Sequence, residues 1–227
     1  MDRLEIHTLI CKKDIFWFKK TIDLFRVYSE IDFDVVIHDD GSFDDFDVIE
    51  LCSRIDNCSV IRRDYADSHI GEFLKNHELC THFRFAEHHT IFRIKLFDIF
   101  YFTKTINVLY LDYDILFCKK PNFLLNLFKN KTGGYLRDTW SAYCVPFRDE
   151  DNNQDVDRFI NAGLNYYPTT DHFNLNYIEE ALFKMYEHGS RGATHPFLEQ
   201  SCIAYMITKL RKDGVIFQEL PHPEYCV

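Results

Sequence analysis

The sequence predicts an α/β protein whose central sheet is mainly parallel and covered by helices on both faces. Short apolar runs alternate with helical patterns through the first half of the 227-residue chain, and this alternation is typical of parallel strands joined by helical crossovers. Hydrophobic residues make up 46% of the chain, far above the content of disordered chains, so we expect a packed core.

The first half contains the clearest elements. A helix is predicted for residues 14–28, because Ile15, Phe18, Ile22 and Phe25 fall on one face at spacings of three and four. Further helices are predicted for 43–54 and 88–103. Apolar runs predict strands at 4–10, 34–38, 58–62 and 107–111.

The second half is less regular. Helices are predicted for 121–129, 175–187 and 197–210, and strands for 159–167 and 215–219. Gly133 and Gly134 are expected to break the chain after the first of these helices. Residues 138–157 are polar, rich in Asp and Asn and without periodicity. We predict that they form a long surface loop, and loops of that length are often lids or binding loops.

Charge and composition exclude several classes of protein. The formal net charge of -10 repels phosphate backbones, which argues against nucleic-acid binding and disfavours docking on anionic lipid. No apolar run reaches the length of a membrane span. The N-terminus lacks the apolar core of a signal peptide, and the eight cysteines form no CxxC pair. We therefore expect reduced thiols and a cytoplasmic location.

Two aspartates, Asp112 and Asp114, follow directly after the apolar run 107–111. In open parallel sheets, ligands bind at the carboxyl ends of strands. Two carboxylates so close together repel each other, and a divalent cation would relieve this repulsion. Carboxylate oxygens suit Mn²⁺ or Mg²⁺, which can also bridge a diphosphate. The alternative is a pair of solvated turn aspartates, but the apolar residues 115–117 disfavour it.

The run Val-Leu-Tyr-Leu-Asp-Tyr-Asp-Ile-Leu at 108–116 resembles the metal-binding strand of GT-A-fold glycosyltransferases, most closely that of family 8, the glycogenin and bacterial galactosyltransferase group. Three more segments agree with that family in order and spacing: Phe-Arg-Ile-Lys-Leu at 92–96, Asn-Ala-Gly-Leu at 161–164 and Glu-Gln at 199–200. The similarity covers roughly residues 88–222. The resemblance implies a Rossmann-like GT-A domain over 1–227, with a donor-binding half at 1–117 and an acceptor-side half at 118–227.

The resemblance also implies roles for individual residues. Arg93 and Lys95 would bring positive charge to the diphosphate of the donor, although they could equally be a charge pair on the helix surface. The intervening Tyr113 would contact the donor, and Asn161, Ala162 and Gly163 would line the sugar pocket. Gly163 would let the backbone approach a sugar ring closely, or it could mark a strand bulge.

Glu199 and Gln200 would lie beside the reacting carbon. The amide groups of Asn161 and Gln200 can both donate to and accept from sugar hydroxyls. Glu199 would be an acceptor base or a sugar ligand. The alternatives are a solvated Glu199 and an ordinary helix-surface Gln200.

Asp39 and Asp40 begin a second segment of interest, Asp-Asp-Gly-Ser, which follows the predicted strand 34–38. This segment resembles one in family 2 GT-A enzymes, in which a carboxylate accepts a hydrogen bond from uracil N3–H. Because Asp, Gly and Ser are also common turn residues, a plain turn at the strand end is the alternative.

The sequence departs from family 8 at two positions. The family usually has Asp where this chain has Glu199, and it takes a third metal ligand from a downstream His. The segment Glu-Leu-Pro-His-Pro at 219–223 resembles the region before that ligand, so His222 is the candidate third ligand. His82, Glu87, His88 and His89 could suggest zinc, but no matching Cys/His pair has suitable spacing.

These observations predict a metal-dependent glycosyltransferase. The resemblance favours transfer of glucose or galactose from a UDP-sugar to an unknown carbohydrate or protein-glycan acceptor, with retention at the anomeric carbon. Two alternatives remain open. A non-catalytic nucleotide-sugar-binding module would explain an incomplete metal site. An aspartate-nucleophile phosphatase also uses two aspartates after a strand, but it normally has a small hydroxyl residue where Leu116 stands.

Overall fold

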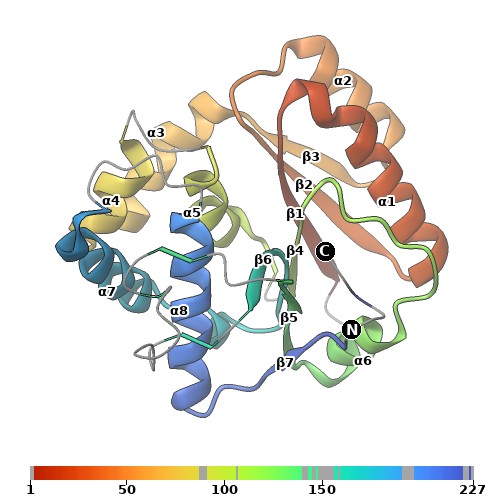
Figure 1. Ribbon diagram of the computed structural model, residues 1–227. Helices are drawn as coiled ribbons and strands as arrows, with labels where there is room; N and C mark the ends of the chain where they lie inside the picture. The colour runs from red at the N-terminus through yellow and green to blue at the C-terminus, as the bar shows by residue number, and fades with distance from the viewer. Residues whose placement is uncertain are drawn as a thin grey trace.

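The computed structural model describes residues 3–86, 91–105, 107–139, 143–144, 147, 156–157, 159–190, 197–221 and 225. Its centre is a seven-stranded sheet with the strand order β3-β2-β1-β4-β6-β5-β7 (Figure 1). The strands are β1 (Leu4–Ile10), β2 (Phe33–Asp39), β3 (Cys58–Ile61), β4 (Val108–Leu111), β5 (Gly133–Arg137), β6 (Ile160–Tyr167) and β7 (Phe217–Glu219).

Most neighbouring strands in the sheet are parallel. Strand β1 pairs in parallel with β2 and β4, β2 with β3, and β5 with β7. Strand β6 is antiparallel to both of its neighbours, β4 and β5. The prediction of a mainly parallel central sheet is therefore confirmed.

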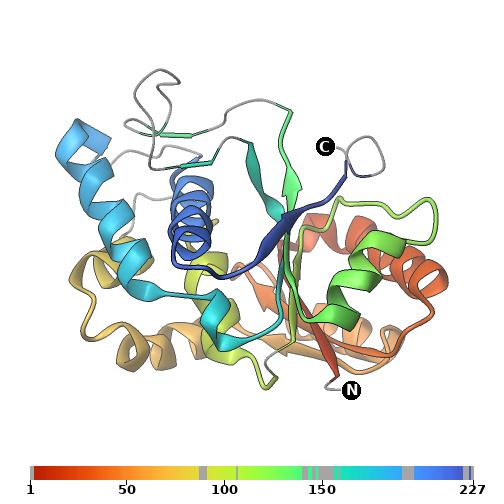
Figure 2. The same cartoon turned by 90° about the horizontal axis from the view of Figure 1, so that it is seen from below.

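Helices cover both faces of the sheet, as Figure 2 shows from below. Two hydrophobic clusters lie on the two sides, and β4 contributes to both because its side chains alternate: Val108 and Tyr110 belong to one cluster, Leu109 and Leu111 to the other. The helices are α1 (Ile15–Ser29), α2 (Asp45–Arg54), α3 (Arg63–Leu74), α4 (Glu78–Phe85), α5 (Arg93–Phe102), α6 (Asn122–Asn130), α7 (Leu175–Met185) and α8 (Leu198–Lys212), with single turns at Lys12–Asp14, Thr170–His172 and Tyr186–Ser190.

Most predicted elements are present, but three observed elements were not predicted. Helices α3 and α4 occupy residues for which no element was predicted. Strand β5 begins with Gly133 and Gly134, which were expected only to break the chain. A Cβ atom on Gly133 would lie 2.7 Å from both His172 and Phe217. Glycine is present there because neighbouring side chains pack onto the strand, and not because the chain turns.

The described residues of 138–157 form no helix or strand, as predicted for a loop, but most of them do not lie at the surface. Asp138, Tyr143, Cys144, Phe147 and Val156 are all buried. The Tyr143 hydroxyl is 3.2 Å from the carbonyl oxygen of Ile160. Tyr143 therefore packs in the core. Trp140 and Arg148 of the same segment lie outside the described residues.

The pairing of β4 with β6 joins the two halves of the chain within one sheet. The assignment of 1–117 to the donor and 118–227 to the acceptor remains a prediction. In the described residues, the helices are too short or too polar to cross a membrane.

Glu179 of α7 holds the N-terminus of α4. Its two carboxylate oxygens each accept a hydrogen bond, both 2.8 Å long, from the backbone N–H groups of Leu79 and Cys80. These groups have no partner within their own helix, and a negative charge is favourable there. Glu179→Ala should lower the free energy of unfolding by about 1–2 kcal/mol. Glu180→Ala, which removes only an exposed pair with Lys209, should change it by less than about 0.5 kcal/mol in the same urea titration.

Two buried histidines predict an acid-sensitive fold. The Nδ1 atom of His7 on β1 lies 3.0 Å from Nε2 of His38 on β2, and both side chains are fully buried. Burial lowers the pKa of both imidazoles, most strongly that of His38, although Glu5 partly opposes the effect on His7. Below their ordinary pKa of about 6.5, the unfolded chain therefore binds protons that the folded chain does not bind.

Stability should consequently fall as the pH drops from about 7.5 to about 5. The hydrogen bonds of Glu5 hold the pKa of its carboxyl at about 2 in spite of burial. The stabilisation that the charged Glu5 carboxylate provides is therefore lost only at pH values below about 5, outside the range in which the histidines act. Urea midpoints at the two pH values measure the change. His38→Gln should flatten the pH dependence, whereas substitution of the exposed His69 by Gln should not.

Candidate active site

The candidate residues of the first half gather where parallel strands end. Asp39 is the last residue of β2, and Asp112 follows β4; both strands pair in parallel with β1. The carboxyl ends of these strands therefore share one edge of the sheet, where open α/β proteins bind ligands. The backbone N–H of Asp112 donates to the carbonyl oxygen of Gly163 on β6, over 2.7 Å, so the second half of the chain reaches the same edge.

Asp112 makes contacts on both of its carboxylate oxygens. Oδ1 lies 3.5 Å from the ammonium group of Lys95 and also accepts a hydrogen bond from the Tyr110 hydroxyl. Oδ2 faces Gly163, where an added Cβ atom would come within 2.9 Å of it. The Asp112 side chain is 30% exposed, so a ligand in solvent can still reach it.

Asp114 belongs to the more exposed part of the site. Partial burial of its carboxyl, together with the negative charge of Asp112, raises the pKa of Asp114. This mutual repulsion is what a bound divalent cation would remove, and carboxylate oxygens are ligands that Mn²⁺ and Mg²⁺ accept. The two aspartates are separated by one residue and supply oxygen donors of the kind that such an ion takes. Within the residues that the structure describes, no group of three or more His, Cys, Asp or Glu side chains is placed to hold a metal.

The predicted third ligand, His222, lies outside the described residues, as do Glu87, His88 and His89. Water and a diphosphate could complete the coordination of an ion held by Asp112 and Asp114, because Mg²⁺ and similar ions usually keep several such oxygen ligands. The third ligand is therefore untested, and the metal site as a whole stays a prediction.

Lys95 and Glu199 form a buried ion pair beside Asp112. The Lys95 Nζ atom is 3.0 Å from Oε1 of Glu199, and both side chains are 5% exposed. Burial alone would lower the pKa of Lys95, but the charges of Asp112 and Glu199 outweigh it and raise that pKa. Burial raises the pKa of Glu199 to about 7 in spite of Lys95. Glu199 is therefore not a solvated surface residue, as one alternative had it.

Gln200 and Asn161 meet at a residue that the sequence analysis had placed in a surface loop. Asp138 is buried, and its Oδ2 atom accepts hydrogen bonds from the side chains of Gln200 over 2.9 Å and Asn161 over 3.4 Å. The Oδ1 atom of Asn161 in turn accepts from the backbone N–H of Gly163 over 2.6 Å. These contacts join β5, β6 and α8 into one polar network that reaches Asp112 through Gly163.

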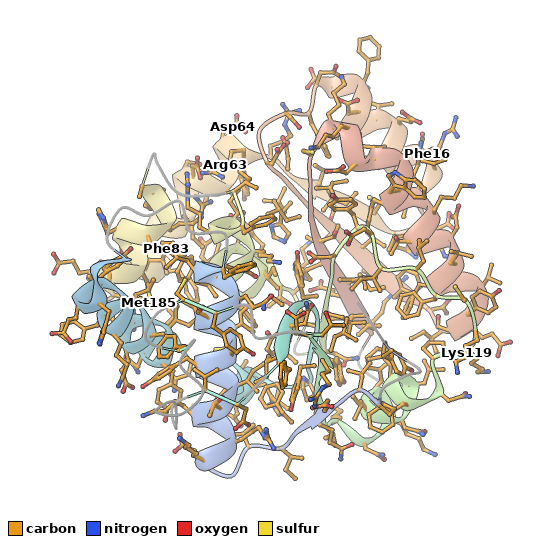
Figure 3. All side chains as sticks on the ribbon, in the orientation of Figure 1. Phe16, Arg63, Asp64, Phe83, Lys119 and Met185 are labelled. Atoms are coloured by element: carbon orange, nitrogen blue, oxygen red, sulfur yellow. The ribbon has the colours of Figure 1, made fainter. Side chains whose placement is uncertain are left out.

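Arg93 lies in a different group of charges from Lys95. Its Nε atom donates to the carbonyl oxygen of Arg84 over 2.9 Å. Burial, with the positive charges of Arg63 and Arg84, lowers the pKa of Arg93. This basic cluster lies between α3, α4 and α5, and Figure 3 labels Arg63 at the start of α3. A Cβ atom on Gly41 would lie 3.5 Å from the Arg63 side chain, so the cluster borders the loop after β2.

The loop after β2 uses Asp39 for its own structure. Oδ1 of Asp39 accepts from the backbone N–H groups of Gly41 and Phe43 over 2.8 and 3.2 Å, and Oδ2 lies 3.2 Å from Nε of Arg62. Asp40 is only half-buried, and its Oδ1 accepts from the N–H of Ser42 over 3.0 Å. Asp40 is therefore better placed than Asp39 to accept a hydrogen bond from a ligand.

Two further predicted residues occupy structural positions. The carbonyl oxygen of Tyr113 accepts a hydrogen bond from the Thr21 hydroxyl of α1 over 2.6 Å, which fixes the turn between the two aspartates. Partial burial, followed by the charges of Asp14 and Asp114, raises the pKa of the Tyr113 phenol. Ala162 is buried in the hydrophobic core beside Gly163.

Sequence reasoning missed Tyr110 and Asp138. Tyr110 lies on β4 two residues before Asp112, which directly follows the strand, so the alternation of side chains could have indicated that both face the same side. Asp138 directly follows β5, which contains the apolar residues Tyr135 and Leu136, as Asp112 follows β4. The same pattern of a carboxylate at a strand end was present there, but the two glycines at the start of the run obscured it.

A methyl group on Gly163 should disturb this site directly. The Cβ atom of Gly163→Ala would lie 2.9 Å from oxygens of both Asp112 and Asn161, which is too close without movement. We expect at least about a tenfold loss of any activity that depends on Asp112, because misplacing a reacting group by about 1 Å is costly. Gly71→Ala on α3 has nothing within 4 Å of the new atom and should leave activity unchanged. Equal activity of the two variants would contradict this account.

Solved structures share this architecture although no family model and no curated protein matches the sequence. Mouse xyloside xylosyltransferase 1 in its apo form superimposes with a TM-score of 0.54 at 11% identity, over 96% of this chain and 85% of that one. The chain has the GT-A glycosyltransferase fold. The galactosyltransferase LgtC, solved with donor and acceptor sugar analogues, gives a TM-score of 0.52 at 14% identity, over 95% of this chain and 72% of that one. Membership of family 8 stays a prediction.

Proposed function

We propose that the chain is a metal-dependent glycosyltransferase that uses a UDP-sugar as donor. The observation that carries this proposal is the meeting of Asp112 with Lys95, Glu199 and Gly163 at the carboxyl edge of a GT-A sheet. Similarity to enzymes that transfer xylosyl and galactosyl groups supports sugar transfer in general. Glucose or galactose as the transferred hexose, retention at the anomeric carbon and a carbohydrate or protein-glycan acceptor follow from the family resemblance alone.

Each part of the site has a role in this proposal. Asp112 and Asp114 would hold Mn²⁺ or Mg²⁺, which would supply positive charge to the departing diphosphate. Lys95 balances the charge of Asp112 when the donor is absent and adds to the positive field when it is bound. Asp40 would accept a hydrogen bond from the base, and the Arg63 side chain lies beside Gly41, the next residue.

The polar network around Asp138 would bind the transferred sugar. Asp138, Asn161 and Gln200 present carboxylate and amide groups that can exchange hydrogen bonds with sugar hydroxyls. Glu199 lies next to them but is held by Lys95, so its role would be to orient the sugar and shape the charge around the reacting carbon. LgtC, which has this fold, was solved with donor and acceptor sugar analogues, and this supports a sugar-binding site in the fold.

A panel of UDP- and GDP-sugars tests the proposal. With Mn²⁺ present, UDP release should appear with at least one UDP-sugar, slowly by hydrolysis without an acceptor and faster with one, and it should stop with a chelator. The absence of both UDP release and UDP binding with either Mn²⁺ or Mg²⁺ would refute the proposal.

The second candidate is a non-catalytic module that binds nucleotide sugars. It is favoured by one observation: within the described residues, no group of three or more His, Cys, Asp or Glu side chains is placed to hold a metal. Calorimetry distinguishes the two functions, because the module would bind a UDP-sugar without releasing UDP across acceptors. A phosphatase would instead hydrolyse a phosphomonoester in a reaction that depends on Asp112.

A further inference from the structure

The ring of Tyr110 packs in the core, but its hydroxyl reaches the candidate metal site. Strand β4, which carries Tyr110, lies in the middle of the sheet (Figure 1). Tyr110 is only 2% exposed and belongs to the hydrophobic cluster that also contains residues of α5 and α8. Its hydroxyl donates a hydrogen bond to Oδ1 of Asp112. A buried polar group therefore lies directly behind a carboxylate that solvent can reach.

Lys95 lies against both partners of this hydrogen bond. Its ammonium is 4.9 Å from the centroid of the Tyr110 ring, which is within the range of a cation–π contact. The same ammonium is 3.5 Å from Oδ1 of Asp112 and 3.0 Å from Oε1 of Glu199. Because Tyr110 and Lys95 are both buried, the two donors that face Oδ1 have fixed positions.

The other oxygen of Asp112 has different surroundings. Oδ2 faces Gly163, and no described residue donates a hydrogen bond to it. Rotation of the carboxylate would exchange its two oxygens, and the donors on Oδ1 oppose that rotation. Oδ2 is therefore the oxygen of Asp112 that remains available to a ligand.

We propose that Tyr110 is a positioning residue for the metal ligand Asp112, an inference that rests on the proposed function. The Tyr110 hydroxyl fixes the Asp112 carboxylate so that Oδ2 is available before the cation binds. Tyr110 acts through Asp112 and touches neither the cation nor the donor. A neutral hydroxyl suits this role, because it orients the carboxylate without cancelling the charge that attracts the cation. Loss of such a partner of a metal ligand commonly weakens metal binding by about tenfold or more.

Tyr166 provides a matched comparison for a purely structural hydroxyl. It is fully buried, belongs to the other hydrophobic cluster, and donates a hydrogen bond of 2.5 Å to Oδ1 of Asn107. Asn107 directly precedes β4, whereas Asp112 directly follows it. Tyr110→Phe and Tyr166→Phe therefore each remove one hydroxyl hydrogen bond from the interior, but only the first removes a contact of the site.

Binding of Mn²⁺ in the presence of UDP tests the proposal, with the paramagnetic resonance signal of free Mn²⁺ as the readout. Tyr110→Phe should weaken Mn²⁺ binding by about tenfold. Tyr166→Phe should bind Mn²⁺ as the wild-type protein does. In sugar transfer, Tyr110→Phe should need about tenfold more Mn²⁺ for half of its maximal rate and should recover most of the wild-type rate at saturating Mn²⁺. Thermal unfolding should show that both variants are folded.

A double variant supplies a second test. Added to Asp112→Ala, the substitution Tyr110→Phe should lower the residual transfer rate by less than about twofold, because the carboxylate through which the hydroxyl acts is gone. Equal Mn²⁺ affinity of Tyr110→Phe and the wild-type protein, or equal weakening by Tyr166→Phe, would overturn the inference and leave the proposed function standing. A wild-type protein that binds neither Mn²⁺ nor UDP would overturn both.

Discussion

Replacement of Asp112 by asparagine should reduce sugar transfer and UDP release by at least about a hundredfold. The amide has nearly the same shape as the carboxylate but carries no charge, so the site would lose the group that holds the cation with Asp114 and balances Lys95. Rates with Mn²⁺ and a saturating UDP-sugar measure the effect. Higher Mn²⁺ concentrations should restore part of the activity if the main defect is weaker metal binding.

The fold should survive this substitution, because the Asp112 side chain is 30% exposed and its backbone hydrogen bond to Gly163 is unaffected. Thermal unfolding of the variant provides that check. Asp171→Asn, at an exposed position of the turn after β6, is the matched control and should keep full activity. Full activity of Asp112→Asn in a well-folded protein would rule out the proposed mechanism.

The part of this site that could be predicted depends on local sequence. An apolar run followed by two carboxylates identifies a strand end by itself, and Asp112 and Asp114 lie where that pattern predicts. Gly163 was predicted on family resemblance, and its function in the structure is steric: it leaves room for the Asp112 carboxylate. Both features lie within a few residues of a recognisable strand.

The contacts between distant segments could not be predicted in this way. Lys95 and Glu199 come from different helices, and only the packing of α5 and α8 on the same face of the sheet brings them within 3.0 Å. Asp138 was assigned to a loop because polar residues follow it, yet β5 places it in the interior. Arg93 looked equivalent to Lys95 from its sequence position, but the helix turns it toward Arg84.

A large loss of stability is expected when the buried ion pair that joins α4 to α5 is broken. Arg84 and Asp98 are fully buried, and two hydrogen bonds of 2.7 Å connect the guanidinium to the two oxygens of the carboxylate. Arg84→Met should lower the free energy of unfolding by about 3–5 kcal/mol, because it leaves the charge of Asp98 buried without a partner. Lys75→Met, which removes an exposed pair with Glu72, should change it by less than about 1 kcal/mol.

A double variant separates the cost of an unpaired charge from the loss of packing. Arg84→Met with Asp98→Leu replaces both buried charges by apolar side chains, and such replacements are often neutral or stabilising. Its unfolding free energy should therefore lie well above that of Arg84→Met alone. Asp67, which lies 2.8 Å from Arg84 but is 37% exposed, can be solvated in both variants and should not obscure the comparison. If the double variant were as unstable as the single one, the stability would come from the shape of the arginine side chain and not from the pairing of its charge.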